Sequence, residues 1–203
     1  MTPRCVCLTL SISVVYLGDM EIDQMIAQAE KLSLSYTDGM PDTRDIYREG
    51  CYRTCDIDGG FAFKISLRDT GTVCNRAEWD FYTMTTDDVR EVLAKPRYIS
   101  RNGKVIVFDC LTMNKDTGGY NTVLRNEFDS QARVAANELT RIVSSAHKVG
   151  IRDLHEGNFG RDDGTNEMLC TDYGALGHAV EYHDDGIGGR EYSKHRLHHL
   201  ISK

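Results

Sequence analysis

Apolar residues recur at intervals of three or four positions in two parts of the chain, and this spacing predicts two amphipathic helices. The first lies within residues 23–32, and the second begins near residue 128 and is stopped by Gly150. The apolar positions are Met25, Ile26, Ala29 and Leu32 in the first helix and Phe128, Ala132, Ala135, Leu139, Ile142, Ala146 and Val149 in the second. We expect the second, more regular stripe to form a long buried helix.

Two shorter helical segments lie between them. Residues 75–84 (NRAEWDFYTM) are expected to form a helix that carries Glu78. A further helix is expected to begin near Thr86, whose hydroxyl can cap the Asp-Asp-Val that follows. It ends at Lys95-Pro96, because proline cannot continue a helix.

Three other patterns predict strands. Residues 50–67 are typical of two strands joined by the Asp-Gly-Gly turn at 58–60, because glycine supplies the positive φ that tight hairpins require. Residues 105–108 are apolar and mostly β-branched, which is typical of a buried strand, and they follow an Asn-Gly turn at 102–103. A short strand is also expected near residues 167–172.

The second strand of the hairpin is predicted to place Lys64 on the face opposite its apolar residues. These residues are Phe61, Phe63, Ile65 and Leu67, which alternate along the strand. In the first strand, Cys51 and Cys55 form either a redox pair or part of one packed side, and their alternate positions favour packing.

The composition limits the class of protein. The chain has 203 residues, a formal net charge of -7, 40% apolar residues and 3 prolines, which suits one globular domain or two small lobes. The acidic balance gives no general attraction to nucleic acid or anionic membrane, so neither is expected as a direct partner. The 7 cysteines include no Cys-x-x-Cys pair, so we expect reduced thiols in a cytoplasmic protein, with neither a disulfide framework nor a zinc site.

The beginning of the chain has three interpretations. Residues 5–17 are mainly apolar and follow a single arginine, which is the rough form of a signal peptide, but they lack a small-x-small cleavage site. They are also too short to span a membrane, so a short strand or a disordered lead-in is favoured. Alternatively, translation begins at Met20, which would be tested by the intact mass of protein expressed from the native gene.

A carboxylate, an amide and a second carboxylate follow the long predicted helix at a particular spacing. Asp153 precedes Asn158 by five residues in RDLHEGN, and Asp172 lies fourteen residues further on in Asp-Tyr-Gly. Phosphoryl transfer needs a carboxylate near the acceptor hydroxyl, oxygen ligands for Mg²⁺ and a cation for the nucleotide phosphates. An isolated Asp-x-x-x-x-Asn is common in turns, so the interpretation depends on the third residue and on Lys64 and Glu78 upstream.

This spacing resembles that of the protein kinase-like superfamily, in which a catalytic Asp precedes a metal-binding Asn by five residues and an Asp-Phe-Gly follows. The variant DLHEGN is similar to the aminoglycoside phosphotransferases and other atypical branches, and to the small kinases carried by bacteriophages. The resemblance extends over roughly residues 45–176. It implies that the chain binds ATP and Mg²⁺.

The resemblance implies a role for each matching residue. Asp153 would accept the proton of the acceptor hydroxyl, Asn158 and Asp172 would bind Mg²⁺, and His155 would touch the transferred phosphate. Lys64 in FAFKI would contact the nucleotide phosphates, and Glu78 would fix its direction.

The remaining nucleotide contacts are implied at two segments. GCYRTC, with Gly50 as its only glycine, would replace the glycine-rich loop. Tyr52 there, like the neighbouring Arg53, is either an edge-strand residue or part of a modified phosphate lid. Asp109 and Leu111 would belong to a hinge whose main chain contacts adenine.

These observations predict an α+β protein with a reduced bilobal kinase-like fold. Residues 1–44 form a lead-in and helix, 45–111 a small β-rich lobe with the hinge, and 112–203 a reduced helical lobe with the catalytic loop. After Gly174, 29 residues remain, and they contain no Ala-Pro-Glu motif. The histidines of the tail, His195, His198 and His199, fit a solvated terminal helix better than a metal site, because no carboxylate or cysteine partner lies near them.

The expected activity is that of a Ser/Thr protein kinase of phage type that acts on host-cell proteins in the bacterial cytoplasm. Two alternatives differ in class. The first is a small-molecule phosphotransferase, favoured by DLHEGN. The second is a catalytically silent kinase-like module that binds a partner protein, favoured by the missing glycines and by Ile151 where many kinases have His.

Overall fold

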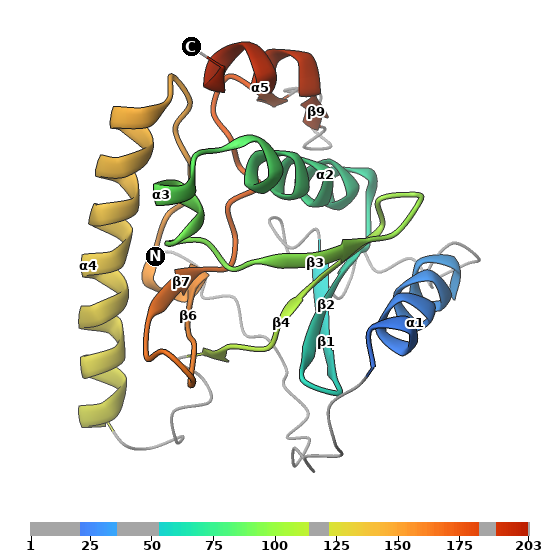
Figure 1. Cartoon of the computed structure of the whole chain (residues 1–203), viewed down its shortest axis with the longest axis horizontal. Coiled ribbons are helices and arrows are strands. Elements are labelled where there is room, and N and C mark those ends of the chain that lie inside the picture. Colours follow the sequence, from blue (N-terminus) through green and yellow to red (C-terminus); the bar gives the residue numbers. More distant parts are fainter. Residues whose placement is uncertain (1–20, 36–52, 114–121, 183–189, 203) are drawn as a thin grey trace, which may run out of the picture.

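The computed structural model describes residues 21–35, 53–113, 122–182 and 190–202, which form an α+β fold (Figure 1). The helices are α1 (Ile22–Ser35), α2 (Asp69–Met84), α3 (Asp87–Arg90), α4 (Thr122–Ala146) and α5 (Lys194–Ile201). The strands are β1 (Arg53–Asp58), β2 (Phe61–Ser66), β3 (Pro96–Ile99), β4 (Val105–Asp109), β5 (Thr112–Met113), β6 (Phe159–Arg161), β7 (Met168–Cys170), β8 (Val180–Tyr182) and β9 (Arg190–Tyr192). The α+β class predicted from the sequence is confirmed.

An antiparallel sheet with the strand order β1-β2-β4-β3 forms one part of the molecule. Its two faces carry different apolar residues because side chains alternate along each strand. One face packs against α1 through Phe63, Ile65, Val105 and Val107 from the sheet and Met25 and Ala29 from the helix. Helix α1 therefore packs directly on the strands that follow it in sequence (Figure 1).

The opposite face of this sheet belongs to the larger core. Ile106 and Phe108 of β4 are buried there together with Ala77 and Phe81 of α2. Lys64 lies on this same face, since it pairs in register with Ile106. The alternation predicted for β2 is thus confirmed, and it directs Lys64 toward α2.

The second part of the molecule consists of α4, two small sheets and α5. The order β5-β6-β7 forms one sheet, and β8 pairs with β9. Phe128, Ala132 and Leu139 of α4 are buried in the core that also contains Phe159 of β6 and Leu197 of α5. This core holds the long helix beside the loop that follows it.

Both glycine turns predicted from the sequence are confirmed. Gly59 and Gly60 have φ values of 52° and 81°, and Gly103 has a φ of 77°. These values lie in the left-handed region that glycine enters without a Cβ penalty. The strand expected near residues 167–172 is also present, as β7.

The predicted helix boundaries need three corrections. Helix α2 begins at Asp69, six residues before the segment predicted from its pattern. Helix α3 stops at Arg90 because the residues after it pair with Cys170 of β7. The Cys170 amide donates to the Val92 carbonyl, and the Cys170 carbonyl accepts a hydrogen bond from the Ala94 amide. Thr86 stands at the N-cap as predicted, but its side chain makes no capping hydrogen bond.

The third correction concerns the end of α4. The helix ends at Ala146, so Val149 is buried outside it although it continues the apolar stripe. The next residue, His147, is buried, and its Nε2 lies 2.7 Å from the Thr85 hydroxyl. Burial lowers the pKa of His147 below its ordinary value of 6.5, although Asp88 acts in the opposite direction.

We expect His147 to make stability fall at mildly acidic pH. Because its folded-state pKa is depressed, the unfolded chain binds a proton more readily. The contribution of neutral His147 to stability is therefore fully present above about pH 6.5, and it is lost as the pH falls from there through the folded-state pKa. Urea unfolding at pH 8 and pH 5.5 measures this loss, and His147→Asn should reduce it. An equal loss in both chains would contradict the prediction.

The predicted environments of Cys55 and of the terminal histidines can be compared with the structure. Cys55 is exposed, so it does not face a packed side as predicted, and Cys51 lies outside the described residues. The terminal helix is present as α5, with His195, His198 and His199 exposed. Within the described residues, no group of three or more His, Cys, Asp or Glu side chains could hold a metal ion.

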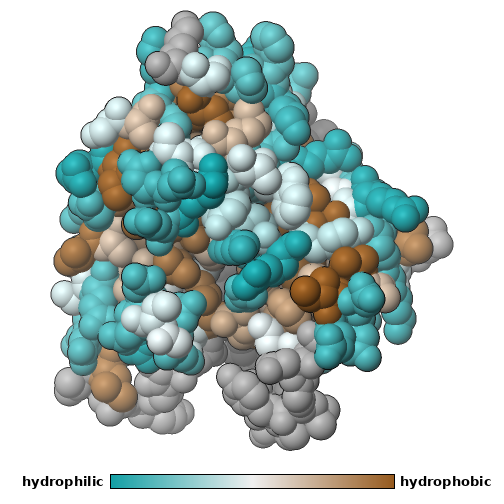
Figure 2. Space-filling model, viewed as in Figure 1, coloured by the Kyte–Doolittle hydropathy of each residue, from teal (hydrophilic) through white to brown (hydrophobic). Residues whose placement is uncertain are grey.

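The surface shows no dominant apolar area on the side seen in Figure 2, where hydrophobic patches alternate with hydrophilic ones. The large apolar side chains that are exposed come from α1, β1 and α4: Ile22, Leu34, Ile57, Leu124 and Val134. No helix among the described residues is long and apolar enough to cross a membrane.

Candidate functional site

Lys64 and Glu78 meet between β2 and α2. The Lys64 Nζ lies 3.3 Å from Glu78 Oε1, and the Glu78 side chain is fully buried. The ammonium also lies 4.7 Å from the centre of the Phe108 ring, which provides a cation–π contact. The pair that the sequence suggested only through residue order is therefore present, and Lys64 is held in one direction.

Asp172 reaches the same cluster through Arg53. The Arg53 guanidinium donates to Asp172 Oδ1 at 2.6 Å and lies 2.9 Å from each of the Glu78 oxygens. It also donates to Asn75 Oδ1 at 3.1 Å, so its position is fixed by two residues of α2. Burial raises the pKa of Asp172, but Arg53 and Lys64 outweigh that effect and hold the pKa well below its usual range. The carboxylate is therefore ionised at neutral pH.

The loop that carries Asp153 folds back on itself. Asn158 Nδ2 donates to the Asp153 carbonyl at 2.7 Å, and Asp153 has a φ of 62°. Aspartate and asparagine tolerate this left-handed conformation better than most residues. The Asp153 side chain is exposed, as required of a group that receives an incoming hydroxyl.

His155 supports the turn at residues 156–158. Its Nδ1 accepts a hydrogen bond from the Gly157 amide at 3.1 Å. In the neutral ring the proton is then on Nε2, which remains a donor. Contact with a transferred phosphate, as the resemblance implied, would therefore use Nε2.

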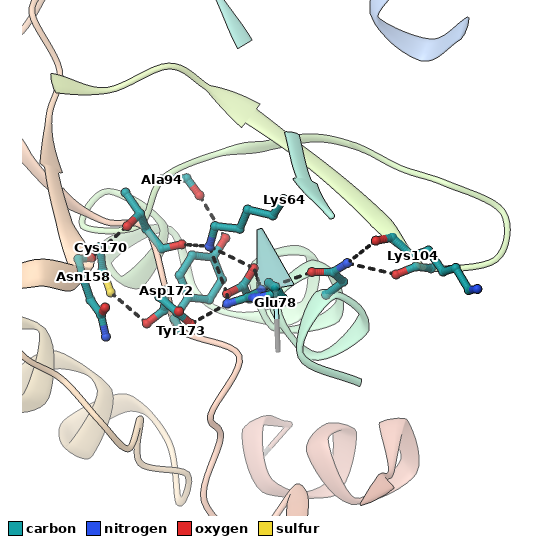
Figure 3. A network of polar contacts seen from close by, with 12 residues as sticks. Lys64, Glu78, Ala94, Lys104, Asn158, Cys170, Asp172 and Tyr173 are labelled. Carbon is teal, nitrogen blue, oxygen red and sulfur yellow. Dashed lines mark hydrogen bonds and ion pairs between the residues drawn. The ribbon is translucent and has the colours of Figure 1, made fainter. Parts of the chain in front are cut away.

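A continuous series of polar contacts joins Asn158, Lys64, Glu78 and Asp172 (Figure 3). The Thr171 amide donates to the Asn158 carbonyl at 2.7 Å, and Lys64 Nζ donates to the Thr171 carbonyl. Asp153 is thus linked through Asn158 and Thr171 to Lys64, although these residues come from distant parts of the sequence. Glu78 and Asp172 complete the series through Arg53, so the side chains of Lys64, Glu78 and Asp172 form one cluster, to which Asn158 and Asp153 are joined by main-chain groups.

The Asp-Tyr-Gly segment is fixed against α2. The Tyr173 side chain is fully buried, its hydroxyl donates to the Ala94 carbonyl at 2.9 Å, and its ring packs edge-on against Phe108. A Cβ at Gly174 would lie 2.7 Å from the Cys74 carbonyl oxygen, which explains why glycine follows Tyr173. The tyrosine in place of phenylalanine is accommodated by its hydrogen bond.

Gly174→Ala is expected to destabilise the fold by about 1–3 kcal/mol, because the added methyl group meets backbone that can yield only if α2 shifts. Urea unfolding at pH 7 measures the effect. Gly150→Ala is the matched control, since a Cβ there meets no atom within 4 Å. A Gly174→Ala chain as stable as the control would show that α2 and this segment are less closely packed than described.

Asp109 and Leu111, the residues predicted for a hinge, lie at the end of β4 and just after it. The Asp109 carboxylate makes a bidentate pair with Arg97, with Nε–Oδ1 and Nη2–Oδ2 distances of 2.8 and 2.7 Å, and Leu111 is largely buried. The Asp109 side chain is therefore occupied, and the main chain is also paired here, since Asp109 is opposite Phe61 in the β2–β4 ladder and the Cys110 amide donates to the Gly60 carbonyl at 2.9 Å. Gly50 and Tyr52 lie outside the described residues.

A cavity of about 240 Å³ opens next to the hinge, away from the polar cluster. Its lining consists of Arg90, Glu91, Leu93, Ala94, Lys95, Asp109, Leu111, Asp162, Glu167 and Leu169. Lys64, Asp153 and Asp172 do not line it. This cavity is therefore not the place where the predicted phosphate chemistry would occur.

The donor set at Asn158 and Asp172 suits Mg²⁺, which binds oxygen and uses few protein ligands when phosphates supply the rest. The Asn158 amide nitrogen is directed to the Asp153 carbonyl, which leaves its Oδ1 as the remaining acceptor. The Asp172 side chain is ionised and 44% exposed. Two features oppose a metal here: the positive charge of Arg53 on Asp172 Oδ1, and the lack, among the described residues, of a third His, Cys, Asp or Glu side chain that would complete a metal-binding group.

Comparisons of the chain with protein-family models, curated proteins and solved structures gave no match. The function is therefore inferred from the site and its residues.

Proposed function

We propose that the chain is an ATP- and Mg²⁺-dependent phosphotransferase with a reduced bilobal kinase-like fold. The observation that carries this proposal is the series of contacts that joins Asn158, Lys64, Glu78 and Asp172 (Figure 3), together with the hydrogen bond from Asn158 to the main-chain carbonyl of Asp153. Phosphoryl transfer needs a general base, metal ligands and a fixed phosphate-binding cation in one place, and these residues supply all three types.

Each residue has a role that follows from its position. Asp153, exposed on its loop, would orient the acceptor hydroxyl and take its proton. Lys64, held by Glu78, would bind the nucleotide phosphates. Asn158 and Asp172 would hold Mg²⁺, which when bound neutralises charge on the phosphate oxygens. His155 would offer its Nε2 proton to the same phosphate.

The acceptor that we favour is a Ser or Thr hydroxyl of a host-cell protein. Asp153, His155 and Glu156 are exposed, so a large acceptor could approach the loop from solvent. The chain after Gly174 is tied to the start of this loop, because the Arg152 amide donates to the Ala175 carbonyl at 2.8 Å. Substrate recognition would therefore use the loop surface and not a long separate activation segment.

The two alternatives lead to different results in the same assay. The Arg53–Asp172 pair favours a catalytically silent module, because it occupies a carboxylate oxygen that a metal would use. An exposed Asp153 speaks against a deeply enclosed small-molecule site within the described residues.

The test is to measure binding of a fluorescent ATP analogue and transfer of labelled γ-phosphate from Mg-ATP in a bacterial extract. Labelled protein bands that require both Mg²⁺ and the intact chain would support a protein kinase. Label in small molecules alone would support the small-molecule enzyme. Absence of nucleotide binding would leave the silent module and overturn the proposal.

A further inference from the structure

The charges of the four ionic residues that contact one another in the candidate site balance without any ligand. Arg53 and Lys64 contribute two positive charges, and Glu78 and Asp172 contribute two negative charges within 3.3 Å of them. The Arg53 side chain is only 11% exposed, and the Glu78 side chain is fully buried. Arg53 was expected either at a strand edge or in a phosphate lid, and the structure places it at the centre of this group instead.

We propose that Arg53 is a built-in counter-ion of Asp172 that makes metal binding at this site depend on nucleotide. This inference rests on the proposed function, since it assumes that Asp172 is a metal ligand. In the absence of nucleotide, the charge of Arg53 would repel a metal ion from Asp172. The metal ion would bind only when nucleotide phosphates add negative charge.

The geometry of Arg53 supports this role because the guanidinium cannot easily withdraw. Its contacts with Glu78 and Asn75 fix it to α2, and its contact with Asp172 at 2.6 Å is made to a single oxygen. Asp172 Oδ2 is the oxygen left for a metal ion. A divalent cation there would lie close to the positive charge of Arg53, whose side chain is 11% exposed, so solvent screens this repulsion only in part.

The same geometry explains the expected effect of nucleotide. The phosphates of ATP carry enough negative charge to offset both cations and the metal ion. Lys64 projects from the strand next to Arg53, so the two cations lie on one face of the β1–β2 hairpin. Metal and phosphate would therefore bind together and metal alone only weakly.

A purely structural role for Arg53 predicts something different. If Arg53 only neutralises Glu78, its removal should lower the stability of the fold without improving metal binding. If it is a counter-ion of Asp172, its removal should improve binding of metal in the absence of nucleotide. Metal affinity therefore separates the two roles independently of catalytic activity.

The experiment measures Mn²⁺ binding to the full chain by electron paramagnetic resonance, with and without a non-hydrolysable ATP analogue. Mn²⁺ serves as the probe because carboxylate, carbonyl and water ligands suit both Mn²⁺ and Mg²⁺. The variant is Arg53→Gln, which keeps hydrogen bonding to Glu78 but removes the charge. Arg141→Gln is the matched control, since Arg141 pairs with Glu138 on the exposed side of α4.

We expect Arg53→Gln to bind Mn²⁺ alone at least about tenfold more tightly than the wild-type chain, with Arg141→Gln unchanged. Adding Asp172→Asn to Arg53→Gln should remove the gain. If Arg53→Gln does not fold, Arg53→Lys replaces it, because a single ammonium cannot hold Glu78, Asn75 and Asp172 together. A gain of about threefold or more is then expected.

Two results would overturn the inference. Unchanged or weaker binding of Mn²⁺ alone by the Arg53 variant, while both chains bind Mn²⁺ with nucleotide, would reject the counter-ion role and leave the proposed function intact. Absence of Mn²⁺ binding in both chains even with nucleotide would reject the proposed function as well.

Discussion

Asp153→Asn is expected to lower the rate of phosphate transfer by about 10²- to 10⁴-fold while nucleotide affinity stays unchanged. The amide cannot accept the proton of the acceptor hydroxyl, whereas the nucleotide is contacted by Lys64 and the metal ligands. Asparagine is the suitable replacement, because Asp153 has a φ of 62° and asparagine tolerates this conformation. Alanine would add backbone strain and confuse the two effects.

Asn166→Asp is a control with the same backbone conformation, since Asn166 also has a φ of 62° and lies in the β6–β7 turn. It exchanges the same two side chains in the opposite direction and should leave the rate unchanged. Initial rates of label transfer at saturating Mg-ATP provide the measurement. Full activity in Asp153→Asn would show that the base is another residue, even if the chain is a kinase.

The polar cluster could be predicted from sequence to the extent that spacing determines it. The intervals between Asp153, Asn158 and Asp172 predicted that a loop and the Asp-Tyr-Gly segment lie next to each other. In the structure, the Thr171 amide beside Asp172 donates to the Asn158 carbonyl of the loop. The alternation in β2 directed Lys64 toward the correct side of the sheet. The meeting of Lys64 with Glu78 could be proposed only from the resemblance, because no local pattern relates a strand residue to a helix residue.

Arg53 was considered only as an edge-strand residue or as part of a phosphate lid, and its contacts with Glu78 and Asp172 were not predicted because they depend on strand register. In the antiparallel pairing of β1 with β2, Arg53 lies opposite Ser66 and Cys55 opposite Lys64. Residues opposite each other share a face, so Arg53 and Lys64 point to the same side. The Gly-Gly turn fixes this register, and counting outward from residues 59 and 60 could have placed Arg53 beside Lys64.

The helix errors have a common physical cause. Helix α2 begins earlier than predicted although its first turns contain Gly71 and Thr72, which have low helix propensity. Tertiary packing of Ala77 and Phe81 stabilises the whole helix. Helix α3 is shorter than predicted because residues 92–94 pair with Cys170, a partner 76 residues or more away. Neither effect can be read from a local window.

The end of the chain supports the helix that carries Glu78, and no sequence pattern indicated this. Asp80 accepts hydrogen bonds from the Tyr192 hydroxyl at 2.7 Å and from Lys194 Nζ at 2.8 Å. Asp80 is two residues from Glu78, so contacts near β9 and α5 act on the same helix as the polar cluster. From the sequence, only a solvated terminal helix was predicted for the residues around α5.

Glu78→Ala is expected to cause the largest loss of stability, about 3–5 kcal/mol in the free energy of unfolding. Glu78 is fully buried, and both of its oxygens contact Arg53, which is 11% exposed. Removing the carboxylate leaves the guanidinium with Asn75 and Asp172 as its remaining partners, and an incompletely compensated buried charge is costly. Urea unfolding at pH 7 measures the change.

A second substitution tests the stated cause of this loss. Arg53→Met in the Glu78→Ala background removes the other charge, so the double variant should regain part of the lost stability. Glu138→Ala breaks an exposed pair with Arg141 and should have a much smaller effect. If the double variant is less stable than Glu78→Ala alone, Arg53 must be stabilised mainly by Asp172. The Arg53–Asp172 contact would then be a structural link between β1 and the Asp-Tyr-Gly segment.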